Sequence, residues 1–308
     1  MTKRLQNKIA ESRLTLPVAV VYAIAIWIAN GLLSGQLWIQ FACFAVSTYL
    51  MVEINNSNAL IRIYSRMVSC AFLFISVASC FLFTSIYGCI AELCVIASLT
   101  TLFHSYQDRR AMVWIFYSFL FISIASLFFP HILYYVPGVW LIMAFFLRSI
   151  SWRSFWASVI GLVLPYWFAA IYLIYTQNFD SFTAHFTQLA VFHPLADYTV
   201  LTTHQIITFL FVFIVSITGI VHYHRNSFND KIRIRMFYDC FTTINLMSLA
   251  FIILQPQHYE LLMRIMIITA SPLIAHFIAL TRTWITNIAF YVILIAVLLL
   301  TGYNLWMP

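Results

Sequence analysis

Eleven runs of apolar residues, each close to the length of a bilayer-spanning helix, follow one another along the chain with short connections. A bilayer core is about 30 Å thick, so a helix needs roughly 20 apolar residues to cross it. Backbone polar groups cannot reach water inside lipid, and spanning segments of this kind therefore fold as helices. The sequence predicts an all-α polytopic bundle of about eleven transmembrane helices. The runs occupy residues 16–34, 37–53, 67–86, 88–104, 112–129, 132–147, 155–176, 204–222, 237–255, 261–280 and 284–306.

The low content of charged residues excludes several soluble classes of protein. Only 8% of the 308 residues are charged and 63% are apolar, whereas soluble globular domains carry about 25% charged residues. This composition excludes a soluble enzyme with an ordinary surface, a nucleic-acid-binding protein and a disordered chain. The formal net charge is +7, but the basic residues lie in short connections, where they encode membrane topology. The predicted partner is the lipid bilayer, and no nucleic acid is expected.

The orientation in the membrane follows from the positions of Lys and Arg. If the N-terminus is cytoplasmic and the runs alternate, fifteen of the sixteen Lys and Arg residues fall on the cytoplasmic side. The positive-inside rule predicts this distribution. Arg264 alone falls on the outer side. Residues 112–147, which contain Pro130, either span the membrane twice or form a re-entrant hairpin, so the predicted number of helices is nine to eleven.

We expect a single integral membrane domain over residues 1–308, because the connections are too short for a soluble module. Residues 1–15 are rich in Lys and Arg and are predicted to form a cytoplasmic basic amphipathic segment on the anionic leaflet. Residues 177–203 place Phe and Leu at near-helical spacing between polar residues. They are predicted to form an amphipathic helix at the outer interface, broken at His193-Pro194 because the residue before proline avoids helical geometry.

Ionisable residues inside a membrane are costly and are therefore the first candidates for function. Near the outer face, Glu260 and Arg264 are four residues apart and share one helical face. They form either a self-neutralising pair or a site where Arg264 receives an anionic headgroup or phosphate, with Glu92 as its partner or as a proton acceptor. Nothing in the sequence places Glu92 beside Arg264. The candidates for catalytic residues on this side are Glu92, Asp180, Asp197 and His193.

On the cytoplasmic side, Arg62 and Arg66 have helical i, i+4 spacing and are candidates for clamping a lipid phosphate. Ordinary positive-inside anchoring is the alternative. The connection 223–236 is predicted to be a solvated turn that contains Asp230, and the neighbouring His222 is explained in the same way. His276 follows Pro272 by four residues and either bonds a carbonyl freed by the proline or takes part in a proton relay.

No motif for a cofactor, a metal ion or a nucleophilic enzyme is found. The histidines of the outer side are scattered, without the spacing that zinc ligands show. All six cysteines lie in apolar runs, where a small buried side chain is the usual role. A Cys80–Cys89 disulfide across a tight turn is the one bridge considered. We therefore predict no metal and no cofactor, and the sequence leaves open whether the protein is an enzyme.

Two stretches, 126–172 and 264–300, carry a recurring order of features. A span is followed by an Arg–aromatic–Arg type of loop, then by G-x-x-x-P-Y, and later by a P-L-x-A-x-F helix. In these features the chain resembles a Bacteroidota family of multi-pass inner-membrane proteins of unknown function. The resemblance implies a Gram-negative inner membrane and a role in the cell envelope, and it supplies no catalytic residues. The residues concerned are Arg148, Trp152, Arg153, Gly161, Pro165, Tyr166, Pro272, Leu273 and Phe277.

Three functions fit these observations, and the sequence favours the first over the two alternatives. The first is a role in envelope biogenesis, in which the protein handles isoprenoid-linked glycans as a glycosyltransferase, a polymerase or an accessory protein. Such enzymes need a carboxylate base and cations for a phosphate leaving group. The second is a transporter or flippase, for which Glu92, Arg264 and His276 inside the membrane would form the site. The third is a non-catalytic scaffold of an envelope complex.

Overall fold

The computed structural model describes residues 4–177, 179–191 and 196–307, and within these ranges every regular element is a helix. The prediction of an all-helical chain is confirmed. Short 3-10 helices lie at Cys80–Thr84 (η1), Pro130–Tyr135 (η2), Tyr198–Val200 (η3), Ser227–Asn229 (η4) and Pro256–His258 (η5). The α-helices are α1 Leu5–Glu11, α2 Thr15–Ala29, α3 Trp38–Asn58, α4 Met67–Ala78, α5 Ile86–Phe103, α6 Met112–Phe128, α7 Val136–Phe145, α8 Trp152–Tyr175, α9 Phe179–Ala190, α10 Thr203–Asn226, α11 Ile232–Leu254, α12 Tyr259–Leu280 and α13 Trp284–Trp306.

Six helical segments of the described chain are long and apolar enough to cross a membrane, so the predicted number of about eleven spans is not confirmed. A seventh is obtained if α1 and α2, which meet at an angle of 88°, are counted as one bent span. Each predicted run is helical, but α4, α6 and the segment Pro130–Phe145 are shorter apolar helices. α6 ends where Phe129 becomes extended before Pro130, because proline disfavours a helical residue before it. The six segments are Ile86–Phe103, Trp152–Tyr175, Thr203–Asn229, Ile232–Leu254, Pro256–Leu280 and Trp284–Trp306.

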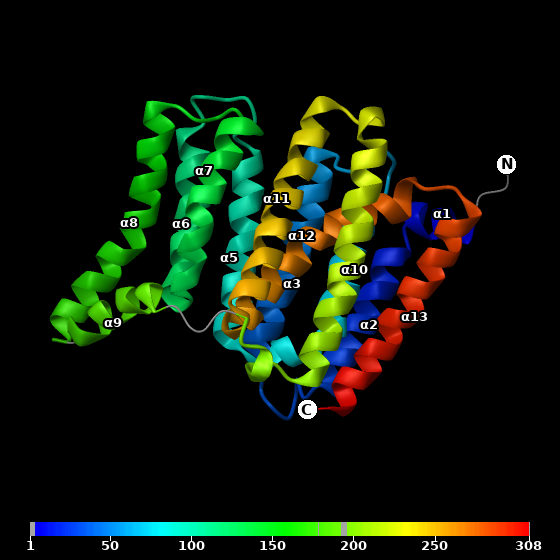
Figure 1. The fold of residues 1–308 in the computed structure, drawn as a ribbon, viewed down its shortest axis with the longest axis horizontal. Coiled ribbons are helices and arrows are strands. Elements are labelled where there is room, and N and C mark those ends of the chain that lie inside the picture. Colours follow the sequence, from blue (N-terminus) through cyan, green and yellow to red (C-terminus); the bar gives the residue numbers. More distant parts are fainter. Residues whose placement is uncertain (1–3, 178, 192–195, 308) are drawn as a thin grey trace.

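α12 is the innermost helix of the bundle. It runs obliquely through the molecule (Figure 1) and packs against α4, α5, α10 and α11. Every residue of α12 except Glu260, Phe277 and Leu280 is buried. The close approach of α10 requires Gly219, because a Cβ at that position would lie 2.8 Å from the carbonyl carbon of Leu273. Polar side chains on α12 are therefore enclosed by other helices.

α8 and α9 lie at one edge of the molecule, with α9 beside the lower end of α8 in Figure 1. α8 packs closely on α6 at Gly161, where a Cβ would lie 2.6 Å from the Phe116 carbonyl oxygen. The hydroxyl of Tyr166 on α8 lies 3.3 Å from His185 Nε2 on α9. A helix thus forms within 177–203, but the predicted break at His193-Pro194 lies outside the described residues.

The N-terminal segment differs from the predicted surface helix. α1 docks on the end of α12, with Gln6 and Asn7 buried. Gln6 Nε2 donates to the Ile278 carbonyl oxygen at 2.6 Å and to Thr281 Oγ1 at 2.7 Å. Asn7 Nδ2 donates to the Thr281 carbonyl oxygen at 2.9 Å. These bonds satisfy carbonyl groups at the end of α12 that no helical N–H can reach, so this part of the segment belongs to the bundle.

Candidate functional site

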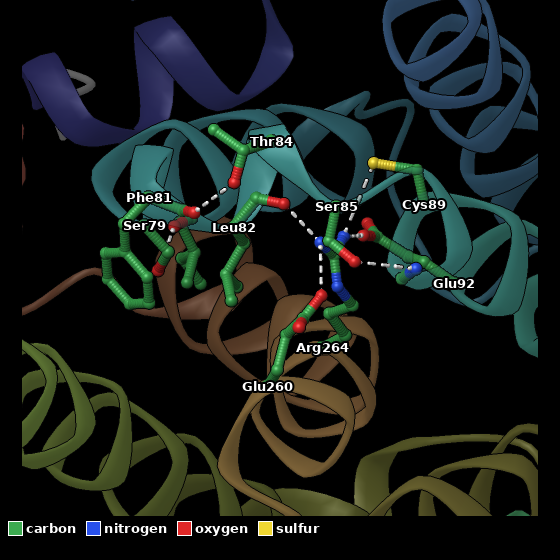
Figure 2. Close-up of polar contacts among 11 residues, drawn as sticks. Ser79, Phe81, Leu82, Thr84, Ser85, Cys89, Glu92, Glu260 and Arg264 are labelled. Atoms are coloured by element: carbon green, nitrogen blue, oxygen red, sulfur yellow. Dashed lines mark hydrogen bonds and ion pairs between the residues drawn. The ribbon is translucent and has the colours of Figure 1, made fainter. Parts of the chain in front are cut away.

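Arg264 is buried together with polar partners from three segments of the chain. Its side chain is 2% exposed. Nη1 donates to Glu92 Oε2 at 2.7 Å and lies 3.7 Å from Cys89 Sγ. Nη2 donates to Glu260 Oε1 at 3.2 Å and to the Leu82 carbonyl oxygen. Figure 2 shows the guanidinium between these groups, which we call the Arg264 cluster (Arg264, Glu92, Glu260 and the Leu82 carbonyl). The predicted Glu260–Arg264 pair is confirmed, and Glu92 joins it from 172 residues away.

The turn between α4 and α5 shapes this cluster. The 3-10 helix η1 redirects the chain after α4 and brings the Leu82 carbonyl to Arg264. Ser85 then caps α5, because its Oγ accepts a hydrogen bond from the Gly88 N–H at 3.1 Å. A Cβ at Gly88 would lie 2.6 Å from Nε and 2.7 Å from Nη2 of Arg264. The guanidinium therefore fits only because residue 88 has no side chain.

The cluster contains one cation and two carboxylates. The side chain of Glu92 is 10% exposed, whereas that of Glu260 is 39% exposed. With both carboxylates ionised, the cluster carries one surplus negative charge, and Glu260 holds its share of that charge at the partly exposed edge of the cluster. The cluster therefore favours uptake of a proton or a cation. An anionic headgroup, which the sequence suggested as a ligand of Arg264, would meet two negative charges and a guanidinium whose Nη1 and Nη2 already donate to Glu92, Glu260 and the Leu82 carbonyl.

A cavity of about 10 Å³ adjoins the Glu92–Arg264 ion pair and is also lined by Trp27, Ser47 and Ser76. Among the described residues, Trp27 Nε1, Ser47 Oγ, Ser76 Oγ and Arg264 Nε are buried polar atoms without a hydrogen-bond partner. Buried polar groups usually have a partner, and the cavity is close to the volume that one water occupies. Two N–H donors and two hydroxyls can satisfy the four hydrogen bonds of a single water. The cavity is thus suited to a water beside the ion pair.

On its exposed side the cluster borders a pocket of about 200 Å³. Leu82, Ser85, Gln205 and Tyr259 contribute to its wall, and Glu260 is the one charged residue among the described lining. Because Glu260 also bonds Arg264, a solute or proton that reaches this pocket meets the first member of the cluster. The polar groups then continue inward to Glu92.

A second buried cluster lies near the other end of α12, about 18 Å from Arg264 along the helix axis. His276 is fully buried. Its Nε2 lies 2.9 Å from Asp230 Oδ2, and its Nδ1 lies 3.3 Å from His222 Nδ1. Arg62 Nη1 approaches Asp230 Oδ1 at 3.9 Å. We call these four residues the His276 cluster. An imidazole between a carboxylate and a second imidazole can accept a proton at one nitrogen and release another from the second.

The structure corrects three predictions about these residues. Asp230, expected in a solvated turn, is buried, and the neighbouring His222 is half-buried. His276, expected to bond a carbonyl freed by Pro272, bonds Asp230 instead. No sequence signal could have found this partner, because Asp230 lies 46 residues from His276. A lone acid in a basic connection is as typical of a solvated turn as of a buried pair.

The third correction concerns Arg62 and Arg66. Residues 59–66 connect α3 to α4 without helical structure, so the spacing of four does not place the two arginines on one helical face. Arg62 Nη1 instead donates to the Asn229 carbonyl oxygen at 3.3 Å, and Arg66 is the residue directly before α4. A shared clamp for a lipid phosphate therefore has no support from this backbone geometry.

Between the two clusters, three helices meet through polar side chains. Asn245 Nδ2 on α11 donates to Thr269 Oγ1 on α12 at 2.9 Å and lies 3.4 Å from Ser216 Oγ on α10. All three side chains are buried. Together with Ser271 on α12, they place buried polar side chains in a largely apolar stretch between the Arg264 and His276 clusters.

The other predicted catalytic residues lie away from these clusters. Asp180 is in the first turn of α9 and is exposed. Asp197 accepts hydrogen bonds from Thr199 Oγ1 at 2.5 Å and from Thr199 N at 3.2 Å, and these bonds hold the pKa of its carboxyl below the ordinary value. In the described contacts, neither aspartate touches Arg264. His193 lies outside the described residues.

The remaining reactive side chains form no further centre in the described ranges. No group of three or more His, Cys, Asp or Glu is arranged to hold a metal ion there. All six cysteines are free, so the Cys80–Cys89 disulfide considered from the sequence does not form.

Comparison with known proteins gives no relative, since no family model, curated protein or solved structure matches the chain. The resemblance to a Bacteroidota inner-membrane family therefore stays a prediction. Function has to be argued from the Arg264 and His276 clusters.

Proposed function

We propose that the protein is an integral membrane transporter that carries protons along α12. The observation that carries this proposal is the presence of two buried ionisable clusters, one near each end of the same enclosed helix. Ionisable side chains inside membrane proteins are costly and typically line ion or proton pathways. Here Arg264 pairs with Glu92 and Glu260, and His276 pairs with Asp230.

The polar groups suggest an order of steps. A proton enters from the pocket at Glu260, passes to Glu92, and leaves through His276 and the half-buried His222. Asn245 and Thr269 lie between the clusters. The stretch between Arg264 and His276 is closed by packing, as expected for a transporter that exposes its sites alternately.

Pro272 supplies a place for α12 to bend. It lies inside the helix between the two clusters, and an internal proline removes one backbone hydrogen bond and kinks a helix. A change of bend at this point would move His276 relative to Arg264.

The proposed topology is the one predicted from the sequence, with nine to eleven crossings in a Gram-negative inner membrane and the N-terminus in the cytoplasm; it requires the shorter apolar helices to cross as well as the six long segments. The connections α7–α8 and α10–α11 lie together at the upper edge of Figure 1, opposite α9. They contain Arg148 and Lys231, and the adjoining helix ends add Arg153, Arg225 and Arg233, which favours a cytoplasmic location. The Arg264 cluster then faces the outside and the His276 cluster faces the cytoplasm.

Handling of an isoprenoid-linked glycan at Arg264 has weaker support, because the guanidinium already donates to two carboxylates and a carbonyl. A non-catalytic scaffold would use both clusters only for stability. Proton flux separates transport from these alternatives.

Proteoliposomes that contain a pH-sensitive dye test the proposal. A potassium diffusion potential, negative inside, is imposed with valinomycin, and the rate of internal acidification is measured. We expect wild-type protein to acidify the lumen faster than protein-free vesicles do. His276→Gln and Glu92→Gln each remove a group that exchanges protons. The acidification rate of each variant is expected to fall to the rate of protein-free vesicles. Asp197→Asn, which neutralises a carboxylate that belongs to neither cluster, is expected to match wild type.

Two results would refute the proposal. One is a wild-type rate equal to that of protein-free vesicles. The other is a wild-type rate in His276→Gln protein. Each variant is compared only after gel filtration and thermal unfolding show that it is folded, so that a lost fold is not read as lost transport.

A further inference from the structure

A second kind of site lies along α13. A groove of about 470 Å³ runs between α2 and α13, and α4, α10 and α12 contribute to its wall. This volume is within the range of pockets that bind small ligands. No residue of the Arg264 or His276 cluster lines the groove. Its occupant is therefore independent of the proposed proton pathway.

The groove is polar at one end only. Its polar lining residues are Lys8, Ser12 and Thr15, all from the corner between α1 and α2, and every other lining residue is apolar. Gln6 N donates to Asn287 Oδ1 at 3.3 Å, which places this corner beside the first turn of α13.

From that corner the apolar wall continues along α13 from Phe290 to Leu298, a length of about 12 Å. A ligand that fits must have a polar head and a slender apolar tail.

The charge at the polar end indicates the type of head. Lys8 is exposed, and Arg4 and Arg13 flank it along the chain, with Glu11 as the one acid between residues 4 and 13. Clustered cations at a membrane surface attract anionic lipids. The ammonium group of a zwitterionic lipid would be repelled by the same cations.

We propose that this groove binds one acyl chain of an anionic glycerophospholipid, with the phosphate of its headgroup at Lys8. Inside a bilayer the apolar wall gives no hydrophobic preference over other lipid contacts. Shape therefore fixes where the chain lies, and charge selects the headgroup. One cation near the surface corresponds to about a fivefold preference for an anionic lipid.

Native mass spectrometry of delipidated protein, titrated separately with dioleoyl phosphatidylglycerol, dioleoyl phosphatidylcholine and undecaprenyl phosphate, tests this site. Leu298→Trp fills the groove, and Leu299→Trp is the matched control, because Leu299 is the next residue on α13 and does not line the groove. We expect wild type and Leu299→Trp to retain one phosphatidylglycerol with about fivefold preference over phosphatidylcholine. Leu298→Trp is expected to lose that lipid, and Lys8→Gln is expected to bind both lipids alike.

If Leu298→Trp and Leu299→Trp retain phosphatidylglycerol equally, the lipid does not bind in the groove and the proposal is overturned. An unchanged preference in Lys8→Gln would overturn the assignment of the headgroup. Stronger retention of undecaprenyl phosphate than of phosphatidylglycerol would replace the glycerophospholipid by an isoprenoid lipid and so contradict the proposal. If Leu298→Trp does not fold, Val18→Trp fills the groove from α2 instead.

Discussion

Replacing Arg264 by methionine is expected to destabilise the protein more than any change at an exposed cation. Arg264→Met keeps most of the side-chain volume but leaves the largely buried Glu92 without its cation. Breaking a buried ion pair from one side costs about 3–5 kcal/mol. Each kcal/mol corresponds to about 2–4 °C in a domain of moderate size, so the unfolding temperature is expected to fall on the order of 10 °C.

The double variant Glu92→Gln with Arg264→Met tests the cause of that loss. Replacing both members of a buried pair by uncharged residues is often neutral or stabilising, so the second change is expected to restore most of the stability. Arg153→Met is the control, because Arg153 is an exposed cation near the start of α8 and belongs to neither cluster. Surface substitutions of this kind usually change stability by less than about 0.5 kcal/mol.

The cysteines provide the assay. Five of the six are buried and Cys43 is half-buried, and none is in a disulfide. A thiol-reactive dye that fluoresces on coupling therefore reports unfolding in detergent as these thiols become exposed. Cys89 lies 3.7 Å from Arg264, so the series is repeated in a Cys89→Ser background. The reasoning is refuted if Arg264→Met unfolds within about 2 °C of wild type, or if the double variant is no more stable than the single.

Three further predictions concern packing and pH. Gly88→Ala is expected to lower the unfolding temperature, because its Cβ would contact Arg264 and Glu260 and overpacking costs about 1–3 kcal/mol. Gly302 has open space around it, so Gly302→Ala is the control and is expected to keep the wild-type unfolding temperature in the same dye assay. Gly219→Ala is expected to separate α10 from α12, and disulfide trapping of cysteine pairs placed across this contact would slow; unchanged trapping would contradict the close approach. Burial lowers the pKa of His185 below its ordinary value of about 6.5. The folded position of α9 therefore has its full stability at pH values above about 6.5. That stability is lost as the pH falls from about 6.5 toward the lower pKa of the folded state, because the unfolded state then binds the proton more readily. Hydrogen exchange of α9 at pH 7.5 and pH 5.5 measures this change, and an equal pH dependence in His185→Gln would exclude the histidine as its cause.

Local features of this chain could be predicted from its sequence. The apolar runs marked every long helix, and the spacing of Glu260 and Arg264 predicted a contact within one turn of helix. A local prediction failed at Arg62 and Arg66 because α3 ends at Asn58, where Ala59 adopts a left-handed conformation with φ 48° and ψ 48°. Helices usually use glycine at such a position, so an alanine gives no signal that the helix stops.

The partners of Arg264 and His276 could not be predicted. In a soluble helix the apolar face marks the buried side, but lipid is as apolar as the protein interior. A run such as α12 therefore gives no indication of which neighbours surround it. Glu92 on α5 lies 172 residues from Arg264, and Asp230 in the α10–α11 connection lies 46 residues from His276, so both contacts form only when the bundle packs.

The separation of Glu92 and Arg264 along the chain has a consequence for synthesis. The ribosome makes α5 first, and at about 5–20 residues per second the 172 residues to Arg264 take on the order of 10 to 30 seconds. During that time Glu92 has no cation partner in the membrane. α12 must then pass between α4 and α5 on one side and α10 and α11 on the other. The earlier helices must therefore remain loosely associated until α12 arrives, and closing around Arg264 is one of the last steps of assembly.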